Sequence, residues 1–519
     1  MSIQLLKSTT IVSLMTLVSR VLGFLRDMVT AYLFGPSMGY DAFVIAFKIP
    51  NFMRRLFAEG AFSQAFVPIL SEYKNQKDPG TTKQFIDHMA GNLMLILTGI
   101  TALGVLIAPL WVLVFAPGFM QNPEKYTLTT ALLRITFPYL LFISLTAMAG
   151  GVLNTYGKFA VPAFTPVFLN ISLILCAWLL SPYCDNPIQA LAWGTFIGGI
   201  VQLLFQLPFL YRLGLLPKPQ INWRDPGVKR VLYLMIPALL GVSVNQLNLL
   251  LSTLFASFLP TGSVSWLYYA ERLMEFPLGG FGVALATVVL PSLSKQHANA
   301  EPQAFSQTVD WGLRWGILMG LPAAIGLGLM AGPLIVTLFK FDAGRFTQND
   351  VLMTQQALAA YALGVPGFML AKILASAYYA RQNIKTPVKI AMATVAVNML
   401  GNAILVYFLA HQGLALATSI SALFNAGMLL GILVYRKWYT VQPGWLSYGT
   451  RLGLSGVAMA SLLITLTPPL PIWFAWSVIE RIQGLALLIA GGVLVYGAAL
   501  WLTGVRKHHL LQSDSVITI

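Results

Sequence analysis

The stretch FKIPNFMRRLFAEGAF, residues 47–62, sets a lysine, two adjacent arginines and a glutamate among phenylalanine, isoleucine, methionine and leucine. The chain around it is equally apolar: of 519 residues, 57% are hydrophobic and only 9% are charged. A soluble globular protein carries about 25% charged residues. The composition therefore favours a protein embedded in a bilayer, and four ionisable groups in such a run need a specific reason.

Long apolar runs recur along the whole chain. A helix needs about 20 predominantly apolar residues to cross the hydrocarbon core. We count fourteen such runs, centred near residues 21, 56, 102, 143, 170, 199, 243, 278, 324, 366, 397, 424, 458 and 494. The connectors between them are too short for a soluble domain. The sequence predicts an all-α integral membrane protein with fourteen transmembrane helices.

The net charge of +15 follows the predicted topology. With a cytoplasmic N-terminus, eighteen Lys and Arg residues fall in inside loops and four in outside loops, namely Lys125, Lys340, Arg345 and Arg481. Lys and Arg concentrate on the cytoplasmic side of membrane proteins. The basic excess therefore predicts a multi-pass protein with both termini in the cytoplasm, and it gives no reason to expect a nucleic-acid partner.

Short similarities recur at nearly one offset along the chain. FVPILS at 66–71 resembles VLPSLS at 289–294, an offset of 223. Three further matches in the same order have offsets of 221, 225 and 224: Thr165–Pro166 with Thr386–Pro387, ALAWG (190–194) with ALATS (415–419), and Tyr211–Arg212 with Tyr435–Arg436. The offset covers six spans, an even number, so both copies would have the same orientation in the membrane.

A parallel repeat of this kind is typical of transporters, whose substrate site lies between the halves near the midplane. We predict an N-lobe at 1–222 with spans 1–6, a C-lobe at 223–440 with spans 7–12, and an extra helix pair with a cytoplasmic tail at 441–519. The alternative is that apolar helices resemble one another without a repeat.

The charged residues of the first two spans cannot all face lipid. Each charge at the centre of a span costs about 2.5–3.5 kcal/mol, so seven would cost about 20 kcal/mol, more than the roughly 5–15 kcal/mol net stability of a folded protein. The seven are Arg20, Arg26, Asp27, Lys48, Arg54, Arg55 and Glu59. We expect Lys48, Arg55 and the nearby Asp41 to reach the headgroups and the others to pair or to line water. Pro50 is expected to kink its helix.

The eighth span carries charges too. Glu271, Arg272 and Glu275 lie within SWLYYAERLMEFPLG, residues 265–279, and Arg272 can pair with Glu275 along the helix. Arginine binds phosphate through a planar fork of donors and does not lose its proton. We therefore expect a central cavity in which arginines receive an anion. The alternative is an internal salt-bridge network that locks the two halves together.

Four segments carry a family resemblance: SRVLGFLRD (19–27), DAFVIAFKIPNFMRRLFAEGAFSQAFVPILSEY (41–73), SWLYYAERLMEFPLG (265–279) and RQNIKTPVKIA (381–391). They resemble the MurJ (MviN) family of the MOP exporter superfamily, the bacterial flippases of the peptidoglycan precursor lipid II. The resemblance extends over essentially the whole chain, including the extra helix pair.

The resemblance implies two six-helix lobes around a cationic cavity, alternating access, and a polyprenyl-pyrophosphate-linked substrate moved across the bacterial inner membrane for cell-wall biogenesis. The extra pair would form a groove for the lipid tail. The family's substrate-binding arginines match Arg20, Arg26, Arg54 and Arg272. Its supporting or gating polar positions match Ser19, Asp27, Asp41, Asn51, Ser265 and Glu275.

One departure concerns the coupling ion. The resemblance implies that some relatives bind sodium through carboxylates in spans seven and eleven, and this chain has none in either span. We expect no cofactor and no resident metal ion. The energy that drives transport would come from a coupling cation or from the membrane potential. The expected partners are lipid II and membrane lipids, with the cell-wall synthesis machinery as a further candidate, and we expect the chain to act as a monomer.

Three other functions are compatible with parts of this sequence. A multidrug antiporter of the same superfamily would favour an acidic, aromatic cavity for cations, and an exporter of another polyprenyl-linked oligosaccharide would need the same arginines. A non-transporting scaffold in cell-wall assembly would use the charges only structurally. The sequence has no G-x-S-x-G, H-E-x-x-H or G-x-x-x-x-G-K motif, which argues against an enzyme.

Overall fold

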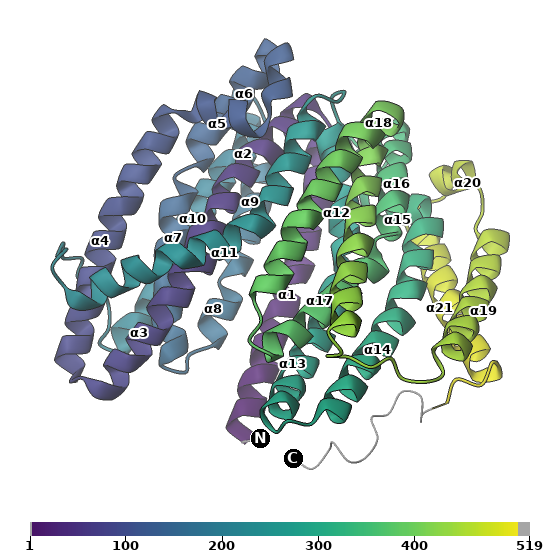
Figure 1. Ribbon diagram of the computed structural model, residues 1–519. Coiled ribbons are helices and arrows are strands. Elements are labelled where there is room, and N and C mark those ends of the chain that lie inside the picture. The colour runs from purple at the N-terminus through teal and green to yellow at the C-terminus, as the bar shows by residue number, and fades with distance from the viewer. Residues whose placement is uncertain (1–2, 507–519) are drawn as a thin grey trace. The chain divides into compact units, whose positions relative to one another are not determined.

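The computed structural model describes residues 3–506, apart from the side chains of 3–11, 58, 59, 238, 240–249, 283, 284 and 287. Over this part of the chain the structure is helical and has no strand (Figure 1). The all-α class predicted from the composition is therefore confirmed. The chain divides into two compact units, Met1–Gly262 and Ser263–Ile519.

The first unit begins with a long helix and continues through several broken ones. Its elements, in which η1 is a π-helix and η2 and η3 are 3₁₀ turns, are α1 (Ile3–Phe34), α2 (Met38–Arg54), η1 (Arg55–Phe62), α3 (Ser63–Gln76), α4 (Pro79–Leu106), α5 (Ala108–Phe115), η2 (Pro117–Gln121), α6 (Pro123–Thr136), α7 (Tyr139–Thr155), α8 (Ala160–Phe164), α9 (Pro166–Leu179), η3 (Ser181–Tyr183), α10 (Gln189–Arg212) and α11 (Pro226–Ser257).

The second unit has a similar order of elements, followed by three further helices. They are α12 (Ser263–Pro277), the π-helix η4 (Leu278–Gly282), α13 (Val283–Ala298), α14 (Pro302–Leu329), α15 (Ala331–Phe339), α16 (Gln348–Ala362), α17 (Val365–Ala380), α18 (Lys385–Tyr435), α19 (Trp445–Leu466), α20 (Leu470–Ala475) and α21 (Val478–Leu502).

The helix boundaries recur along the chain at the offset that separates FVPILS from VLPSLS. Helices α4 and α14 are both 28 residues long, and both ends of α14 lie at this offset from the ends of α4. Helices α1 and α11 are both 32 residues long and are related in the same way. A π-helix follows α2 at Arg55 and follows α12 at Leu278, again at the same offset. This recurrence supports the repeat that the short sequence similarities indicate.

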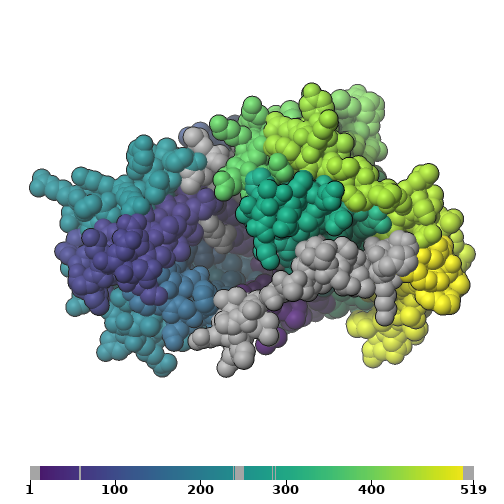
Figure 2. Space-filling view, turned by 60° about the horizontal axis from the view of Figure 1, so that its bottom comes forward, coloured from purple at the N-terminus to yellow at the C-terminus, as the bar shows by residue number. Residues whose placement is uncertain are grey.

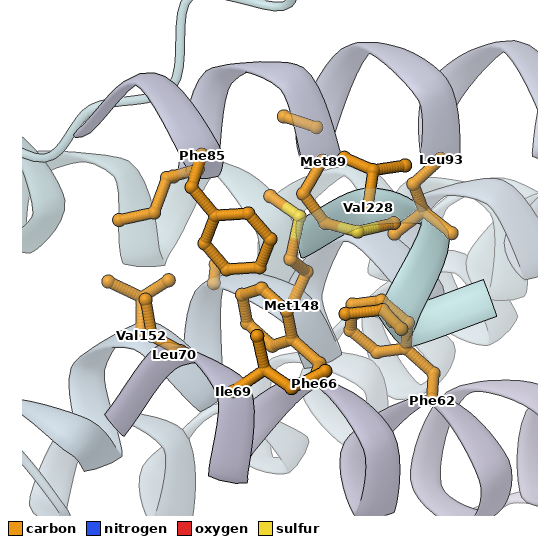
Figure 3. Packing of buried hydrophobic residues seen from close by; sticks show 14 of the residues in the cluster. Phe62, Phe66, Ile69, Leu70, Phe85, Met89, Leu93, Met148, Val152 and Val228 are labelled. Atoms are coloured by element: carbon orange, nitrogen blue, oxygen red, sulfur yellow. The ribbon is translucent and has the colours of Figure 1, made fainter. Parts of the chain in front are cut away.

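The core of the first unit lies where α3, α4 and α7 meet (Figure 3). Phe66 projects from α3, Phe85 and Met89 from α4, and Val152 from α7, and all four side chains are buried. The rings of Phe66 and Phe85 stack with centroids 5.9 Å apart. Lipid tails are as apolar as these side chains, so close packing rather than escape from water stabilises such a core in a bilayer.

The second unit has a core at matching positions. Val289 and Leu293 on α13 correspond, at the repeat offset, to Phe66 and Leu70, and they pack with residues of α14 and α17 in a single buried cluster. The two cores therefore use the same turns of the corresponding helices.

Helix α4 begins at a side-chain cap formed by Asp78. Helices α3 and α4 are coloured indigo in the space-filling view of Figure 2. The carboxylate of Asp78 accepts hydrogen bonds from the hydroxyl of Thr81 (2.6 Å) and from its backbone N–H (2.9 Å). These bonds lower the pKa of Asp78. At pH values above the usual carboxyl pKa, the cap therefore contributes fully to the stability of the folded state. This contribution is lost as the pH falls through the lowered pKa of Asp78.

The connector of residues 213–225 is attached to α4. Asp87 accepts hydrogen bonds from the backbone N–H of Lys218 through its side chain (2.7 Å) and from that of Gln220 through its own carbonyl (3.1 Å). The Nδ2 atom of Asn92 donates to the carbonyl of Asn222 (3.0 Å). Asp225, which caps α11, lies 2.7 Å from Nδ1 of His88. The start of α11 is thereby fixed to the first unit.

Helix α11 packs within the first unit, mainly on η1 and α3. Sequence similarity assigned it to the C-lobe, because it is the repeat counterpart of α1. Sequence similarity therefore groups α11 with the C-lobe, whereas its packing groups it with the first unit. The lobe boundaries at 1–222, 223–440 and 441–519 stay a prediction.

The close approach of the connector to α4 gives a stability prediction. A Cβ atom added to Gly91 would lie 2.3 Å from the backbone oxygen of Gln220, so the connector would have to move. We expect Gly91→Ala to lower the free energy of unfolding by about 1–3 kcal/mol, measured by denaturant titration of the purified protein. Gly99→Ala on the same helix meets no atom within 4 Å and should leave stability unchanged or raise it by up to about 1 kcal/mol. Equal effects of the two changes would contradict this account.

Eight helices in the described residues are long and apolar enough to cross a membrane, and the bent pair α16 and α17 brings the number to nine. Helix α18 has 51 residues, and its backbone turns at Ala410, where φ is 46°. The segments on either side of this turn lie side by side, because Nδ2 of Asn398 is 3.4 Å from the hydroxyls of both Thr418 and Ser421, so α18 is a pair of helices joined at Ala410. It covers the two runs predicted around residues 397 and 424. All fourteen predicted centres lie in helices.

The last helices, α19 and α21, lie side by side with α20 in the connection between them (Figure 1). The linker before α19 is held by Asp310 on α14. Its carboxylate accepts hydrogen bonds from Oη of Tyr439 (2.7 Å) and Nε1 of Trp445 (2.6 Å), and Nε of Arg314 donates to it as well (2.6 Å). Burial and the neighbouring Asp310 raise the pKa of Tyr439, so its hydroxyl stays protonated and donates.

Candidate functional site

Arg26 and Asp27 form a buried ion pair on α1. The Nη2 atom of Arg26 lies 2.6 Å from Oδ1 of Asp27, and the two residues are 7% and 1% exposed. Nη1 of Arg26 donates to Oδ1 of Asn170 on α9 (3.2 Å), and Nδ2 of Asn170 donates to the carbonyl of Ser19 (3.3 Å). Asn170 thus connects two predicted site residues, Ser19 and Arg26, and Arg26 in turn pairs with Asp27. The side chain of Arg20 is exposed.

Asp41 forms a second buried ion pair. Its Oδ2 atom lies 2.7 Å from Nζ of Lys125 on α6 and accepts the backbone N–H of Gly262 (2.8 Å). Asp41 is 0% exposed and Lys125 is 4% exposed. The expectation that Asp41 reaches the headgroups is therefore wrong, and Lys125, predicted in an outside loop, lies in the first turn of α6 with its side chain buried. Each charge is instead neutralised inside the unit, where burying either alone would be costly.

The charged stretch of residues 47–62 is divided between the α-helix α2 and the π-helix η1. The α2 helix continues through Pro50 to Arg54, and the departure from α-helical geometry begins at Arg55 rather than at the proline. Nε of Arg54 donates to Oδ1 of Asn51 (2.8 Å), so these two predicted site residues are adjacent. π-Helical segments inside helices occur frequently at functional sites.

The remaining charges of this stretch differ in their surroundings. Nζ of Lys48 donates to the hydroxyl of Thr253 on α11 (3.4 Å), a contact within the unit that gives no support to the expected headgroup position. Arg55 is exposed, in agreement with that expectation. The side chain of Glu59 lies outside the described residues.

Helix α12 in the second unit carries the other charged cluster. Nη1 of Arg272 lies 3.2 Å from Oε2 of Glu275, which confirms the pairing predicted from their spacing. Their side chains are 35% and 49% exposed. A pair this exposed contributes about 0–1 kcal/mol to stability, so a ligand could replace Glu275 at little cost. Glu271 on the same helix is half-buried.

Ser265 lies at the start of α12 and is fully buried. Next to it, Nε1 of Trp266 donates to Oδ1 of Asp350 on α16 (2.8 Å). Asp350 also accepts the hydroxyl of Thr347 in the capping box of α16. Ser265 therefore lies where α12 is fastened to α16.

Sequence reasoning missed the partners of the predicted residues. Asn170 and Lys125 contact Arg26 and Asp41 from helices 144 and 84 residues away. The signal for Asn170 is a lone amide in the apolar run PVFLNISLILC, residues 166–176. In a bilayer such a polar group needs a partner, although the sequence does not say which one.

Long apolar helices, recurring helix boundaries and charged groups held within the helices are typical of an α-helical membrane transporter. Comparison with known proteins gives the family. The model of the family "Lipid II flippase MurJ" matches residues 30–484. The chain belongs to the MurJ family of lipid II flippases, as the resemblance of its charged segments predicted.

Several relatives match over nearly the whole chain. A probable lipid II flippase MurJ of Vibrio cholerae is 47% identical, covering 98% of each chain, and one of Haemophilus influenzae is 46% identical, covering 96% of this chain and 100% of its own. The lipid II flippase MurJ of Burkholderia cenocepacia is 43% identical over 95% of this chain and 96% of its own.

Solved structures agree with this assignment. A lipid II flippase MurJ in an inward closed conformation matches with a TM-score of 0.79 and 28% identity, covering 94% of this chain and 97% of its own. A multidrug resistance MATE family transporter of the MOP superfamily matches with a TM-score of 0.65 and 13% identity, covering 81% and 95%. The second likeness concerns the fold alone.

Proposed function

We propose that this protein flips lipid II from the cytoplasmic to the outer leaflet of the bacterial inner membrane by alternating access. The observation that carries the proposal is the 47% identity to a probable lipid II flippase over 98% of both chains. The substrate carries a pyrophosphate and a polar headgroup, which cannot cross hydrocarbon unaided.

The proposed roles of the arginines follow their surroundings. Arg54 lies beside the amide of Asn51 and Arg272 beside the carboxylate of Glu275, and both arginines are partly exposed, which suits groups that contact the pyrophosphate directly. Arg20, also exposed, is proposed as a third contact. Arg26 is buried against Asp27 and Asn170, so we assign it a role in positioning α1 at the substrate site rather than direct contact with the pyrophosphate.

The proposed topology has fourteen spans, arranged as two six-helix lobes and an extra pair, with both termini in the cytoplasm. Helices α19 and α21 would provide the groove for the lipid tail, since Leu487 and Leu494 on α21 are 74% and 71% exposed. Action as a monomer and contact with the cell-wall synthesis machinery are parts of the same proposal.

The proposed energy source is the membrane potential. Helices α11 and α18 contain no Asp or Glu. Buried amide and hydroxyl side chains of α18 bond one another: Nδ2 of Asn402 donates to Oδ1 of Asn398 (3.0 Å), and Asn398 lies 3.4 Å from the hydroxyl of Ser421. Without a carboxylate these groups fit poorly as ligands for a sodium ion. An inside-negative potential of 100 mV favours outward movement of each negative charge by about 2.3 kcal/mol.

The alternatives differ in their support. A multidrug antiporter would need an acidic cavity, whereas the partly exposed charges Arg20, Arg54 and Arg272 are cationic. An exporter of another polyprenyl-linked oligosaccharide would use the same phosphate chemistry, and only the family match argues for lipid II.

Depletion of the protein in its host tests the proposal. We expect lipid II to accumulate in the inner leaflet and to become inaccessible to an enzyme added outside the membrane, while other polyprenyl-linked oligosaccharides remain accessible. Accumulation of another such oligosaccharide with normal access to lipid II would favour the alternative exporter. Unchanged access to both would favour the scaffold.

A further inference from the structure

A pocket on the first unit lies apart from the charged residues discussed above. It has a volume of about 390 Å³ and lies between the turn after α7 and the end of α10. Its lining combines apolar and cationic side chains: Lys158, Phe159, Val161, Phe209, Arg212 and Leu213. None of these residues is assigned a part in the proposed transport mechanism.

The local backbone places two cations at the rim of this pocket. Gly157 adopts a φ of 77°, which lets the N–H of Lys158 bond the carbonyl of Leu153 (2.8 Å) and ends α7. Arg212 is the last residue of α10, and its guanidinium carbon lies 6.0 Å from the centroid of the Phe209 ring. Both cationic side chains are exposed, and neither forms an ion pair within the described part of the chain.

A third cation lies close to the same turn. Nζ of Lys74 donates to the carbonyl of Thr155 (2.7 Å) and lies 4.6 Å from the centroid of the Tyr156 ring. Lys74, Lys158 and Arg212 were all predicted on the cytoplasmic side from the charge distribution. The pocket is therefore in a locally positive environment.

Aromatic rings extend from the pocket along α10 and α9. Phe209 packs on Phe205 with centroids 5.5 Å apart, and Phe205 packs on Phe168 (4.5 Å) and Phe164 (5.8 Å). All four side chains are half-buried. They form a continuous apolar surface that starts beside the cations, so the site offers a charged end and an apolar extension to one ligand.

We propose that this pocket binds an anionic phospholipid of the surrounding leaflet. Lys158 and Arg212 would contact its phosphate, and the rings of Phe209, Phe205 and Phe168 would hold an acyl chain. Basic pockets between membrane helices on the cytoplasmic side recognise anionic headgroups in this way. A zwitterionic lipid offers the same chain but no net charge, so the two cations should discriminate against it. The site goes beyond the proposed flipping function.

The test uses the full-length protein in lipid nanodiscs with phosphatidylglycerol and, separately, phosphatidylcholine. For Lys158→Gln with Arg212→Gln we expect the Kd for phosphatidylglycerol to rise at least tenfold and that for phosphatidylcholine to stay unchanged. The matched control is Lys385→Gln with Lys389→Gln, which removes two exposed charges from the corresponding end of the second repeat and should preserve binding. An equal loss in the control, or no loss in the pocket variant, would overturn the proposal.

Two further arms identify the ligand. Water-soluble glycerol 3-phosphate should not compete with phosphatidylglycerol, because it lacks the acyl chain; effective competition would show a plain phosphate site and overturn the lipid assignment. Lipid II should not displace phosphatidylglycerol from the pocket. If lipid II does displace it, the pocket is part of the substrate path and the proposal of a separate phospholipid site is overturned. Circular dichroism checks folding, and the rate of lipid II flipping by the same variant is measured separately, so failure of this site and failure of the proposed function are distinguishable.

Discussion

Arg272→Ala should reduce lipid II flipping to background while leaving the protein folded and inserted. Arg272 lies on α12 beside Glu275, and its side chain is 35% exposed. Hydrogen bonds to charged groups contribute about 1.5–3 kcal/mol each. A bidentate bond between this guanidinium and a phosphate would therefore be worth at least about 3 kcal/mol, which corresponds to more than about 100-fold in rate if the bond stabilises the transition state. Loss of the exposed ion pair costs stability only about 0–1 kcal/mol.

The measurement is the appearance of lipid II in the outer leaflet of cells whose own flippase has been depleted. Arg272→Lys should retain part of the rate, because the charge stays and the planar fork is lost. Arg345→Ala removes an arginine that is exposed outside the proposed site and should flip normally. A normal rate for Arg272→Ala would show that Arg272 does not bind the substrate.

Lys125→Met should have the largest effect on stability. The substitution removes the cation 2.7 Å from Asp41, whose side chain is fully buried. Removing one partner of a buried ion pair typically costs about 3–5 kcal/mol, because the remaining charge is uncompensated. We expect this loss in the free energy of unfolding, measured by denaturant titration in a mild detergent.

The double variant Asp41→Asn with Lys125→Met separates charge from packing. Because neither charge of this pair remains, the double variant should recover most of the stability that Lys125→Met loses. Lys125 also lies 4.2 Å from the centroid of the Phe119 ring, so a small loss from the missing contact is expected to remain. A double variant as unstable as the single one would mean that packing, not charge, makes Lys125 necessary.

The features that the sequence predicted correctly depend on local spacing. The helical class follows from long apolar runs, and the pairing of Arg272 with Glu275 follows from their positions one turn apart on one helix. The repeat offset, found from a few weak similarities, agrees with the boundaries of α4 and α14.

The features that could not be predicted depend on partners far along the chain. Asp41 was expected to reach the headgroups because it lies near a helix end, but Lys125, 84 residues away, neutralises it in the interior. The bond between Arg26 and Asn170 joins helices 144 residues apart. The packing of α11 on the first unit is likewise fixed by contacts of the 213–225 connector with α4, and no repeat pattern encodes them.

Transport by the purified protein tests the central claim most directly. The full chain is reconstituted in vesicles that contain lipid II, and the headgroup accessible to an added enzyme is measured on each side, with and without an inside-negative potential and a sodium gradient. We predict that the headgroup reaches the opposite leaflet, faster under the potential and independently of sodium. If lipid II stays in its original leaflet under all these conditions, the protein is not a flippase of this lipid.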